Sequence, residues 1–184
     1  MGTHKGKSEN KGGEDARRVR GLACKRRGEM VEAEFLAKAA RLEFRVAKPW
    51  GETDRYDFVV DAGSGFWRVQ VKHTRCRRGE QYCVTLARDG EPYNAKEVDF
   101  LVVYVEPEDL WYVLPVEVVA SRRALGLLPW SRRSKFDRYR EAWCLMTCSR
   151  KARGWKDVPV LCRGAKLGVR CAACPKGGRA EVNL

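Results

Sequence analysis

The sequence has no apolar run that approaches the roughly 18 residues of a transmembrane span, and its N-terminus lacks the apolar core of a signal peptide. These absences exclude a membrane-spanning or secreted chain, so we predict a soluble cytoplasmic protein without a membrane partner. No internal repeat is visible either. With 184 residues and 44% hydrophobic content, the chain is long enough for one ordinary domain with a core of its own.

A standard zinc-finger spacing is also missing, although the chain has eight cysteines. Eight cysteines suit a disulfide framework only in a secreted chain, so we expect most of them to be reduced. Cys162, Cys171 and Cys174 would need a fourth ligand, such as Cys148, to hold zinc, and their spacing matches no standard finger. Zinc is therefore not expected as a cofactor.

Positive charge is abundant. The chain has 37 Lys and Arg against 24 Asp and Glu, which gives a formal net charge of +13 at pH 7. Such a balance favours nucleic acid or another anionic surface as the partner, and composition alone does not choose between them.

The composition divides the chain into three parts. Residues 1–20 are rich in Gly, Lys, Glu and Arg with almost no apolar side chains, so we predict a disordered basic arm. Residues 21–149 alternate periodic apolar segments with turn signals and form the predicted folded domain. Residues 150–184 are again basic, contain Gly and Cys, and are expected to be a mostly irregular tail.

Residues 28–42 have the periodicity of an amphipathic helix. At 100° per residue, Glu32 points into the apolar stripe, Glu29 lies at its edge, and Glu34 lies on the solvent side. Glu32 is therefore the first candidate for a functional carboxylate and Glu29 the second. The alternative is a slightly rotated stripe that leaves Glu32 half exposed. The predicted stripe consists of Phe35, Leu36, Ala39 and Leu42.

A hairpin is predicted after a short strand at 44–47 and a polar loop at 48–55. Residues 56–60 and 66–72 read as its strands, and the Ala-Gly-Ser-Gly run at 62–65 as its turn. Strand alternation places Arg68, Gln70 and Lys72 on one face of the return strand. Since the strands are antiparallel, Asp57 meets Gln70 and Lys72 at one end of the hairpin, where Glu32 closes the cluster.

The second half of the domain supplies further scaffold. Residues 98–105 and 111–119 are apolar strands separated by the turn at 106–109, and residues 135–146 read as a helix with aromatic side chains on one side. The predicted fold class is α/β (α+β), with a mixed central β-sheet flanked by α-helices.

The order Gly28-x-x-x-Glu32, Asp57, Gln70-x-Lys72 resembles the core of the PD-(D/E)XK nucleases, in the spacing of archaeal Holliday-junction resolvases and intron-encoded homing endonucleases. Flanking blocks are similar to a bacterial family of this superfamily that is related to the homing enzymes. They include Lys48-Pro49-Trp50-Gly51, Arg55-Tyr56-Asp57-Phe58 and Trp111-Tyr112-Val113-Leu114-Pro115. The resemblance covers roughly residues 28–145. It implies a restriction-endonuclease-like fold, DNA as the partner, a bacterial nucleoid-associated location, and a homo-oligomer, either a dimer or a tetramer.

The resemblance also implies a metal-dependent mechanism. Mg²⁺ prefers oxygen ligands and usually takes one or two carboxylates, so Asp57 and Gln70, with the Val71 carbonyl implied by the family, form the expected inner shell, and Mn²⁺ can substitute. Glu32 binds a second metal or orients a water, and Lys72 positions the attacking water or stabilises developing charge. Gln70 stands where the superfamily usually has an acid. The homing subgroup shares this substitution, so it does not by itself imply a dead enzyme, although metal affinity is expected to be lower.

The predicted function is a Mg²⁺-dependent DNA endonuclease. A non-catalytic DNA-binding or repair-accessory protein with the same fold is the alternative, and an RNA-binding protein that uses the basic tails is a third. Phosphate contacts come from Lys and Arg with a salt-dependent affinity, whereas sequence is read at base edges. The residues predicted to bind nucleic acid are Arg68, Thr74, Arg75, Arg77, Arg78, Arg132 and Arg133.

Overall fold

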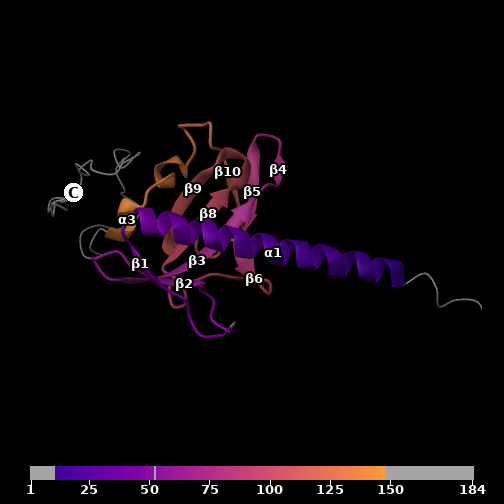
Figure 1. Ribbon diagram of the computed structural model, residues 1–184. Helices are drawn as coiled ribbons and strands as arrows, with labels where there is room; N and C mark the ends of the chain where they lie inside the picture. The colour runs from indigo at the N-terminus through magenta and orange to yellow at the C-terminus, as the bar shows by residue number, and fades with distance from the viewer. Residues whose placement is uncertain (1–10, 52, 148–184) are drawn as a thin grey trace, which may run out of the picture.

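The computed structural model describes residues 11–51 and 53–147. Its main sheet has the strand order β1-β2-β3-β8-β9, in which β3 and β8 are parallel and all other neighbours are antiparallel. A single long helix, α1 (Lys11–Arg41), runs across this sheet (Figure 1). The strands are β1 (Arg45–Ala47), β2 (Phe58–Asp61), β3 (Phe66–Thr74), β8 (Phe100–Val105) and β9 (Leu110–Pro115).

Smaller elements surround the main sheet. A second sheet has the order β10-β5-β4, and β6 pairs with β7. None of the described helices is long and apolar enough to cross a membrane. The bounds are β4 (Arg77–Arg78), β5 (Gln81–Thr85), β6 (Ala87–Arg88), β7 (Glu91–Pro92), η1 (Glu106–Glu108), α2 (Val116–Val119), β10 (Ala124–Leu127), η2 (Asp137–Tyr139) and α3 (Cys144–Thr147).

One part of the hydrophobic core lies between α1 and the main sheet. The Phe35 ring of α1 stacks on Phe58 with ring centroids 5.1 Å apart, and it meets the Trp111 ring edge-on at 6.2 Å. Strand β8 is buried over nearly its whole length, as expected for an interior strand that is covered on both faces. These contacts fix α1 above β3, where the candidate site lies.

The predicted hairpin is confirmed. β2 and β3 pair with Phe58 opposite Val69 and Asp61 opposite Phe66, and the turn between them uses Gly63 at φ 82°, a left-handed conformation that glycine adopts without strain. The mixed sheet with few helices matches the restriction-endonuclease-like α+β fold that the resemblance implied.

The helix differs from its prediction at its N-terminal end. It begins at Lys11, so residues 11–20, predicted as part of a disordered arm, are helical. Ala, Arg and Glu favour helix, and adding residues to an existing helix avoids the cost of nucleation. The buried stripe also lies slightly rotated: Val31, Phe35 and Ala39 are buried, whereas Leu36 is 42% exposed. The first ten residues, the tail at 150–184 and the C-terminal cysteines discussed above lie outside the described residues.

The prediction of one helix over residues 135–146 is wrong. The chain forms the short turn η2, then a bridge between Arg140 and Tyr112, and then the short helix α3. Glu141 adopts a left-handed φ of 49° and donates its N–H to the Trp111 carbonyl at 2.8 Å, and this tertiary contact competes with helix formation. The strand predicted for residues 111–119 likewise ends at Pro115, and α2 follows. The aromatic side chains of residues 135–146 are nevertheless buried in the core, as expected.

Candidate active site

The site lies where β2 and β3 separate. Their pairing ends with Phe58 opposite Val69, after which the Asp57 N–H still reaches the Val69 carbonyl at 2.9 Å. From Val69 to Thr74, β3 pairs with β8 on its other side. No described strand pairs with the β2-side edge of β3 after Val69, so backbone groups beside Gln70 and Val71 are open to other partners.

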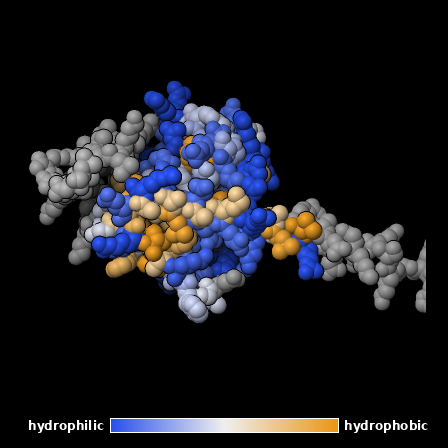
Figure 2. Space-filling model, in the orientation of Figure 1, coloured by the Kyte–Doolittle hydropathy of each residue, from blue (hydrophilic) through white to orange (hydrophobic). Residues whose placement is uncertain are grey.

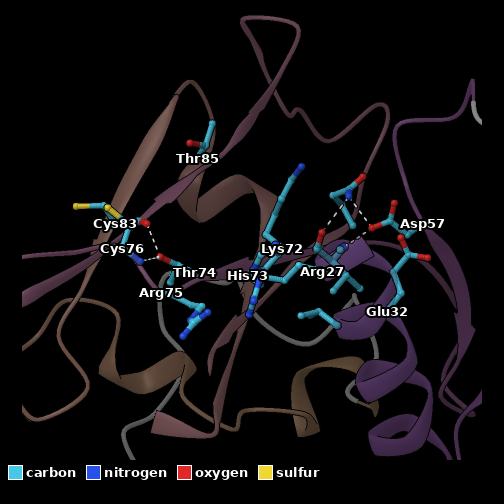
Figure 3. A pocket seen from close by; sticks show the side chains of 14 residues that line it. Arg27, Glu32, Asp57, Lys72, His73, Thr74, Arg75, Cys76, Cys83 and Thr85 are labelled. Atoms are coloured by element: carbon cyan, nitrogen blue, oxygen red, sulfur yellow. Dashed lines mark hydrogen bonds between the residues drawn. The ribbon is translucent and has the colours of Figure 1, made fainter. Parts of the chain in front are cut away.

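Asp57 is bound to the two residues that the sequence placed beside it. Its Oδ2 atom accepts a hydrogen bond from the Val71 backbone N–H at 2.8 Å and another from Gln70 Nε2 at 2.5 Å. The same Gln70 nitrogen donates to the Val71 carbonyl oxygen at 3.0 Å. Hydrogen bonds therefore link the Asp57 carboxylate, the Gln70 carboxamide and the Val71 carbonyl in one small cluster (Figure 3).

A cavity of about 540 Å³ opens beside this cluster between α1, β3 and β5. All five residues predicted to form the active centre line it, so the structure brings together segments that are far apart in the sequence. Figure 3 shows the carboxyl groups of Glu32 and Asp57 close to each other at one end of it. The lining residues that carry the site are Glu32, Asp57, Gln70, Val71 and Lys72.

The electrostatics of Asp57 reflect its place in the cavity wall. Burial raises the pKa of its carboxyl group above the usual value, and the neighbouring charge of Glu32 raises it further. The Val71 N–H, the Lys72 ammonium and the Gln70 carboxamide act in the opposite direction without cancelling the rise. The ionised form of Asp57 is thus poorly compensated by the protein itself, and a cation at this point would stabilise it.

Glu32 lies at the mouth of the cavity rather than inside the core, with 26% of its side chain exposed. Its Oε2 atom accepts a hydrogen bond from Lys48 Nζ at 2.8 Å, and this contact is the chief reason that the pKa of Lys48 is raised. The partial exposure agrees with the alternative of a rotated stripe. The sequence analysis assigned no role at the site to Lys48, and its sequence signals are its place in the flanking block Lys48-Pro49-Trp50-Gly51 and at the start of the polar loop after β1.

Lys72 is positioned by a buried aromatic ring. Its Nζ atom lies 5.2 Å from the centroid of the Tyr93 ring, which is 2% exposed, and the Arg55 guanidinium lies 4.9 Å from the same ring. The negative ring face attracts both cations. Tyr93 was also missed, because no pattern in the sequence connects it with Lys72.

The residues predicted to bind nucleic acid fall into two groups. Arg75 lines the cavity, and four other arginines are exposed in β4 and in the loop before Phe136: Arg77, Arg78, Arg132 and Arg133. Arg68 instead pairs with Asp99 at 3.1 Å and donates to a backbone carbonyl, and the buried Thr74 hydroxyl donates to the Cys83 carbonyl at 2.5 Å. Thr74 also lines the cavity, but these protein contacts occupy the side chains of both Arg68 and Thr74.

The donor set fits a hard cation. In the described part of the chain, no three His, Cys, Asp or Glu side chains form a metal-binding group, so carbonyl-type oxygens would have to complete a site here. Gln70 Nε2 already lies within hydrogen-bonding distance of both the Asp57 carboxylate and the Val71 carbonyl. Oxygen and nitrogen of a carboxamide are exchanged by a half-turn, which would direct three oxygens to one point. Oxygen ligands with a single carboxylate suit Mg²⁺ or Mn²⁺.

The chain is similar to known proteins. The family model described as PD-(D/E)XK endonuclease matches residues 22–143. The structure of a bacterial homing endonuclease, I-Ssp6803I, is similar with a TM-score of 0.56 and 30% identity, over 65% of this chain and 87% of that one. A Holliday junction resolvase, Hjc of Archaeoglobus fulgidus, aligns at 15% identity and a TM-score of 0.37, over 55% of this chain and 83% of that one. No curated protein matches. The chain belongs to the PD-(D/E)XK endonuclease family, as its Glu32, Asp57 and Gln70-Val71-Lys72 pattern predicted.

Proposed function

We propose that the protein is a divalent-metal-dependent endonuclease that hydrolyses phosphodiester bonds in DNA. The observation that carries the proposal is the convergence of the Asp57 carboxylate, the Gln70 carboxamide and the Val71 carbonyl at the open edge of β3, inside a cavity that also contains Lys72 and Glu32. Both the family and the homing endonuclease structure support this reaction class.

In this proposal Asp57, Gln70 and the Val71 carbonyl hold the cation. A bound Mg²⁺ or Mn²⁺ would lower the pKa of water and neutralise charge that develops on the phosphate. The protein supplies the placement of the oxygens: the Val71 N–H holds Asp57, and the parallel pairing with β8 holds the strand that carries Gln70 and Val71.

Lys72 adds the positive charge of a protein side chain to that of the bound cation. The Tyr93 ring holds its ammonium group, and its charge acts on Asp57, so it is placed to bind a phosphate oxygen or the attacking water beside that carboxylate. Glu32 accepts a hydrogen bond from Lys48 at the cavity mouth. We assign to Glu32 the orientation of water, or a second cation, at that position.

DNA approaches along the arginines next to the cavity. Arg75 lies in the cavity wall, and Arg77 and Arg78 follow it on the exposed strand β4. Such side chains contribute phosphate contacts whose strength falls with salt, without specifying sequence. A subunit with one such site cuts one strand, so we also propose that the protein acts as a homo-oligomer.

Nicking of supercoiled plasmid and of branched DNA, with Mg²⁺ or with EDTA, tests the proposal. We expect nicking by the wild type with Mg²⁺ or Mn²⁺, none with EDTA, loss of nicking in Asp57→Ala, and a strongly reduced but measurable nicking rate in Lys72→Ala. Asp54→Ala is the matched control, because Asp54 is an exposed acid three residues away in the loop and should leave nicking unchanged.

A non-catalytic DNA-binding protein is the second candidate. It is favoured by Gln70, which brings no negative charge and whose amide nitrogen, in this structure, is bonded to both oxygens that a metal would use. DNA binding measured by fluorescence anisotropy separates the two functions. Tight binding without nicking of any substrate, in Mg²⁺ and in Mn²⁺, would overturn the nuclease and establish the binding protein.

A further inference from the structure

Trp130 is a half-exposed aromatic side chain that its neighbours hold in place. The residue is 51% exposed, yet its ring lies against the Tyr82 ring with centroids 5.7 Å apart, and the Arg77 guanidinium lies 4.7 Å from its centroid. Tyr82 is itself buried, and its hydroxyl donates to Glu108 at 2.8 Å. These contacts fix the indole and leave about half of its surface open to solvent.

The open side of the indole faces away from the small sheet β10-β5-β4. Arg77 and Tyr82 stand opposite each other in the pairing of β4 with β5, and opposed side chains of an antiparallel pair project from the same face. Both therefore meet Trp130 from the sheet side. The exposed half of the residue is then the far face of the ring, where a planar group can stack.

The loop that carries Trp130 is held by hydrogen bonds. Ser131 donates its N–H to the Leu128 carbonyl at 3.2 Å, which closes a turn with Pro129 at the position that proline favours. The Arg140 guanidinium donates to the Pro129 carbonyl at 2.7 Å. Because the ring is fixed before any ligand arrives, stacking on it costs little further conformational entropy.

Arginines flank the indole on two loops. Arg132 and Arg133 are the exposed central residues of the next turn, which a hydrogen bond from the Ser134 N–H closes. The two residues of β4, Arg77–Arg78, are exposed as well. Residues 77–82 and 128–135 contain a single acid, Glu80. Figure 2 shows mostly hydrophilic side chains over the region where Figure 1 places β4, so the indole lies in a basic, polar surface.

An aromatic ring among arginines fits one class of ligand. Nucleobases of any identity stack on exposed aromatic side chains, while basic side chains bind the phosphates between them. In duplex DNA the faces of a base are covered by the neighbouring base pairs, so only an unpaired or terminal base can present its face. We propose that an unpaired base of a single-stranded DNA segment stacks on Trp130. The platform for this segment consists of Trp130 with Arg77, Arg78, Arg132 and Arg133.

The platform adjoins the cavity along the chain. Cys76, which lines the cavity, directly precedes Arg77, so β4 leads from the proposed cleavage site towards the platform. A DNA that has an unpaired segment beside a cleavable strand, such as a branch or an overhang, would contact both. The choice of DNA over RNA rests on the proposed function. The stacking itself does not, because it involves none of the residues assigned to the metal or to hydrolysis.

Binding of a single-stranded DNA oligonucleotide in EDTA, measured by fluorescence anisotropy, tests the platform without any cleavage. Trp130→Leu keeps an apolar cover on Tyr82 but removes the ring, and should weaken binding about tenfold, whereas Trp130→Phe should bind within about threefold of wild type. Phe66→Leu is the matched control, because Phe66 is a 74% exposed aromatic residue at the β2–β3 turn and should bind like wild type. Thermal melting verifies that each variant is folded.

A strand with abasic sugars separates stacking from phosphate contacts, because it keeps the backbone charge and lacks the bases. Wild type should prefer the normal strand, and this preference should shrink about tenfold in Trp130→Leu. If Trp130→Leu binds the normal strand like wild type, or loses the same factor on both strands, Trp130 is only a structural cover for Tyr82 and the proposal is overturned.

Photocrosslinking tests the site in the wild-type chain, with no variant that has to fold. A single strand that carries 5-iodouracil should crosslink to Trp130, as located by mass spectrometry, and crosslinks found only at other residues would overturn the proposal. An RNA strand of the same sequence should bind no more tightly, and a preference for RNA would overturn the choice of DNA. Since all of these measurements are made in EDTA, their failure would concern the platform alone, and absence of nicking with Mg²⁺ would concern the nuclease alone.

Discussion

The two halves of β3 belong to one continuous strand but have different partners and different roles. From Phe66 to Val69 the strand is bonded to β2, and after Val69 that edge is open while the other edge is bonded to β8. The bonded half contributes Trp67 and Val69 to the core, and the open half carries Gln70, Val71 and Lys72. The site is therefore created where β2 ends, because an edge without a strand partner leaves carbonyl and amide groups for a carboxylate and a cation.

The largest effect is expected from Asp57→Asn in the open half. Outer-shell groups around metal ligands typically change affinity or activity 10–100-fold, so loss of the ligand charge itself should reduce nicking by at least about 100-fold. The melting temperature should stay level or rise, because burial already destabilises the ionised carboxyl and asparagine can still accept from the Val71 N–H. Plasmid nicking measures the loss of activity, and thermal melting measures the change in stability. A large fall in melting temperature would show that Asp57 serves the fold.

Val69→Ala, in the bonded half, should have the opposite effect: it should lower stability and leave nicking almost unchanged. Val69 is fully buried, so removing two methyl groups should lower the free energy of unfolding by about 2 kcal/mol. Nicking by the folded protein at low temperature should remain near wild type, because the side chain faces the core. Urea unfolding measures the free energy of unfolding, and a nicking assay well below the melting temperature measures activity. Loss of nicking without loss of stability would contradict the division of the strand.

Gln70→Glu tests whether the open half of β3 holds a metal ion. The new carboxylate would be almost completely buried beside Asp57, and two close carboxylates repel each other, so the variant should melt at a lower temperature than wild type in EDTA. Mg²⁺ should raise its melting temperature more than it raises that of the wild type, corresponding to about tenfold tighter binding. Melting in a Mg²⁺ titration is the measurement, and it does not depend on activity. Equal shifts in both proteins would place the metal elsewhere.

The sequence predicted the open half of β3 well because its determinants are local. Strand alternation and a glycine-containing turn bring Asp57 beside Gln70, and helical periodicity brings Glu32 over them. Lys48 and Tyr93 could not be predicted, because the course of their loops depends on tertiary packing. The prediction of a helix over residues 135–146 was wrong for the same reason. The aromatic spacing is compatible with a helix, but the hydrogen bond between Glu141 and Trp111 forms only once the sheet has folded.

The smallest expected effect concerns the positioning of Lys72 by Tyr93, which connects the open half of β3 to a loop outside the main sheet. Tyr93→Leu removes the ring face and should slow nicking about 3- to 10-fold, the range of a partly buried cation–π contact. Tyr93→Phe keeps the ring and should nick like wild type, because the buried Tyr93 hydroxyl has no hydrogen-bond partner among the described residues. In the Lys72→Ala background, Tyr93→Leu should add no further loss, since the interaction it removes is already gone. Nicking rates of the wild type, Tyr93→Leu, Lys72→Ala and the double variant, with DNA affinity measured beside them, form the cycle. If the two losses multiply, Tyr93 acts on the fold and not through Lys72.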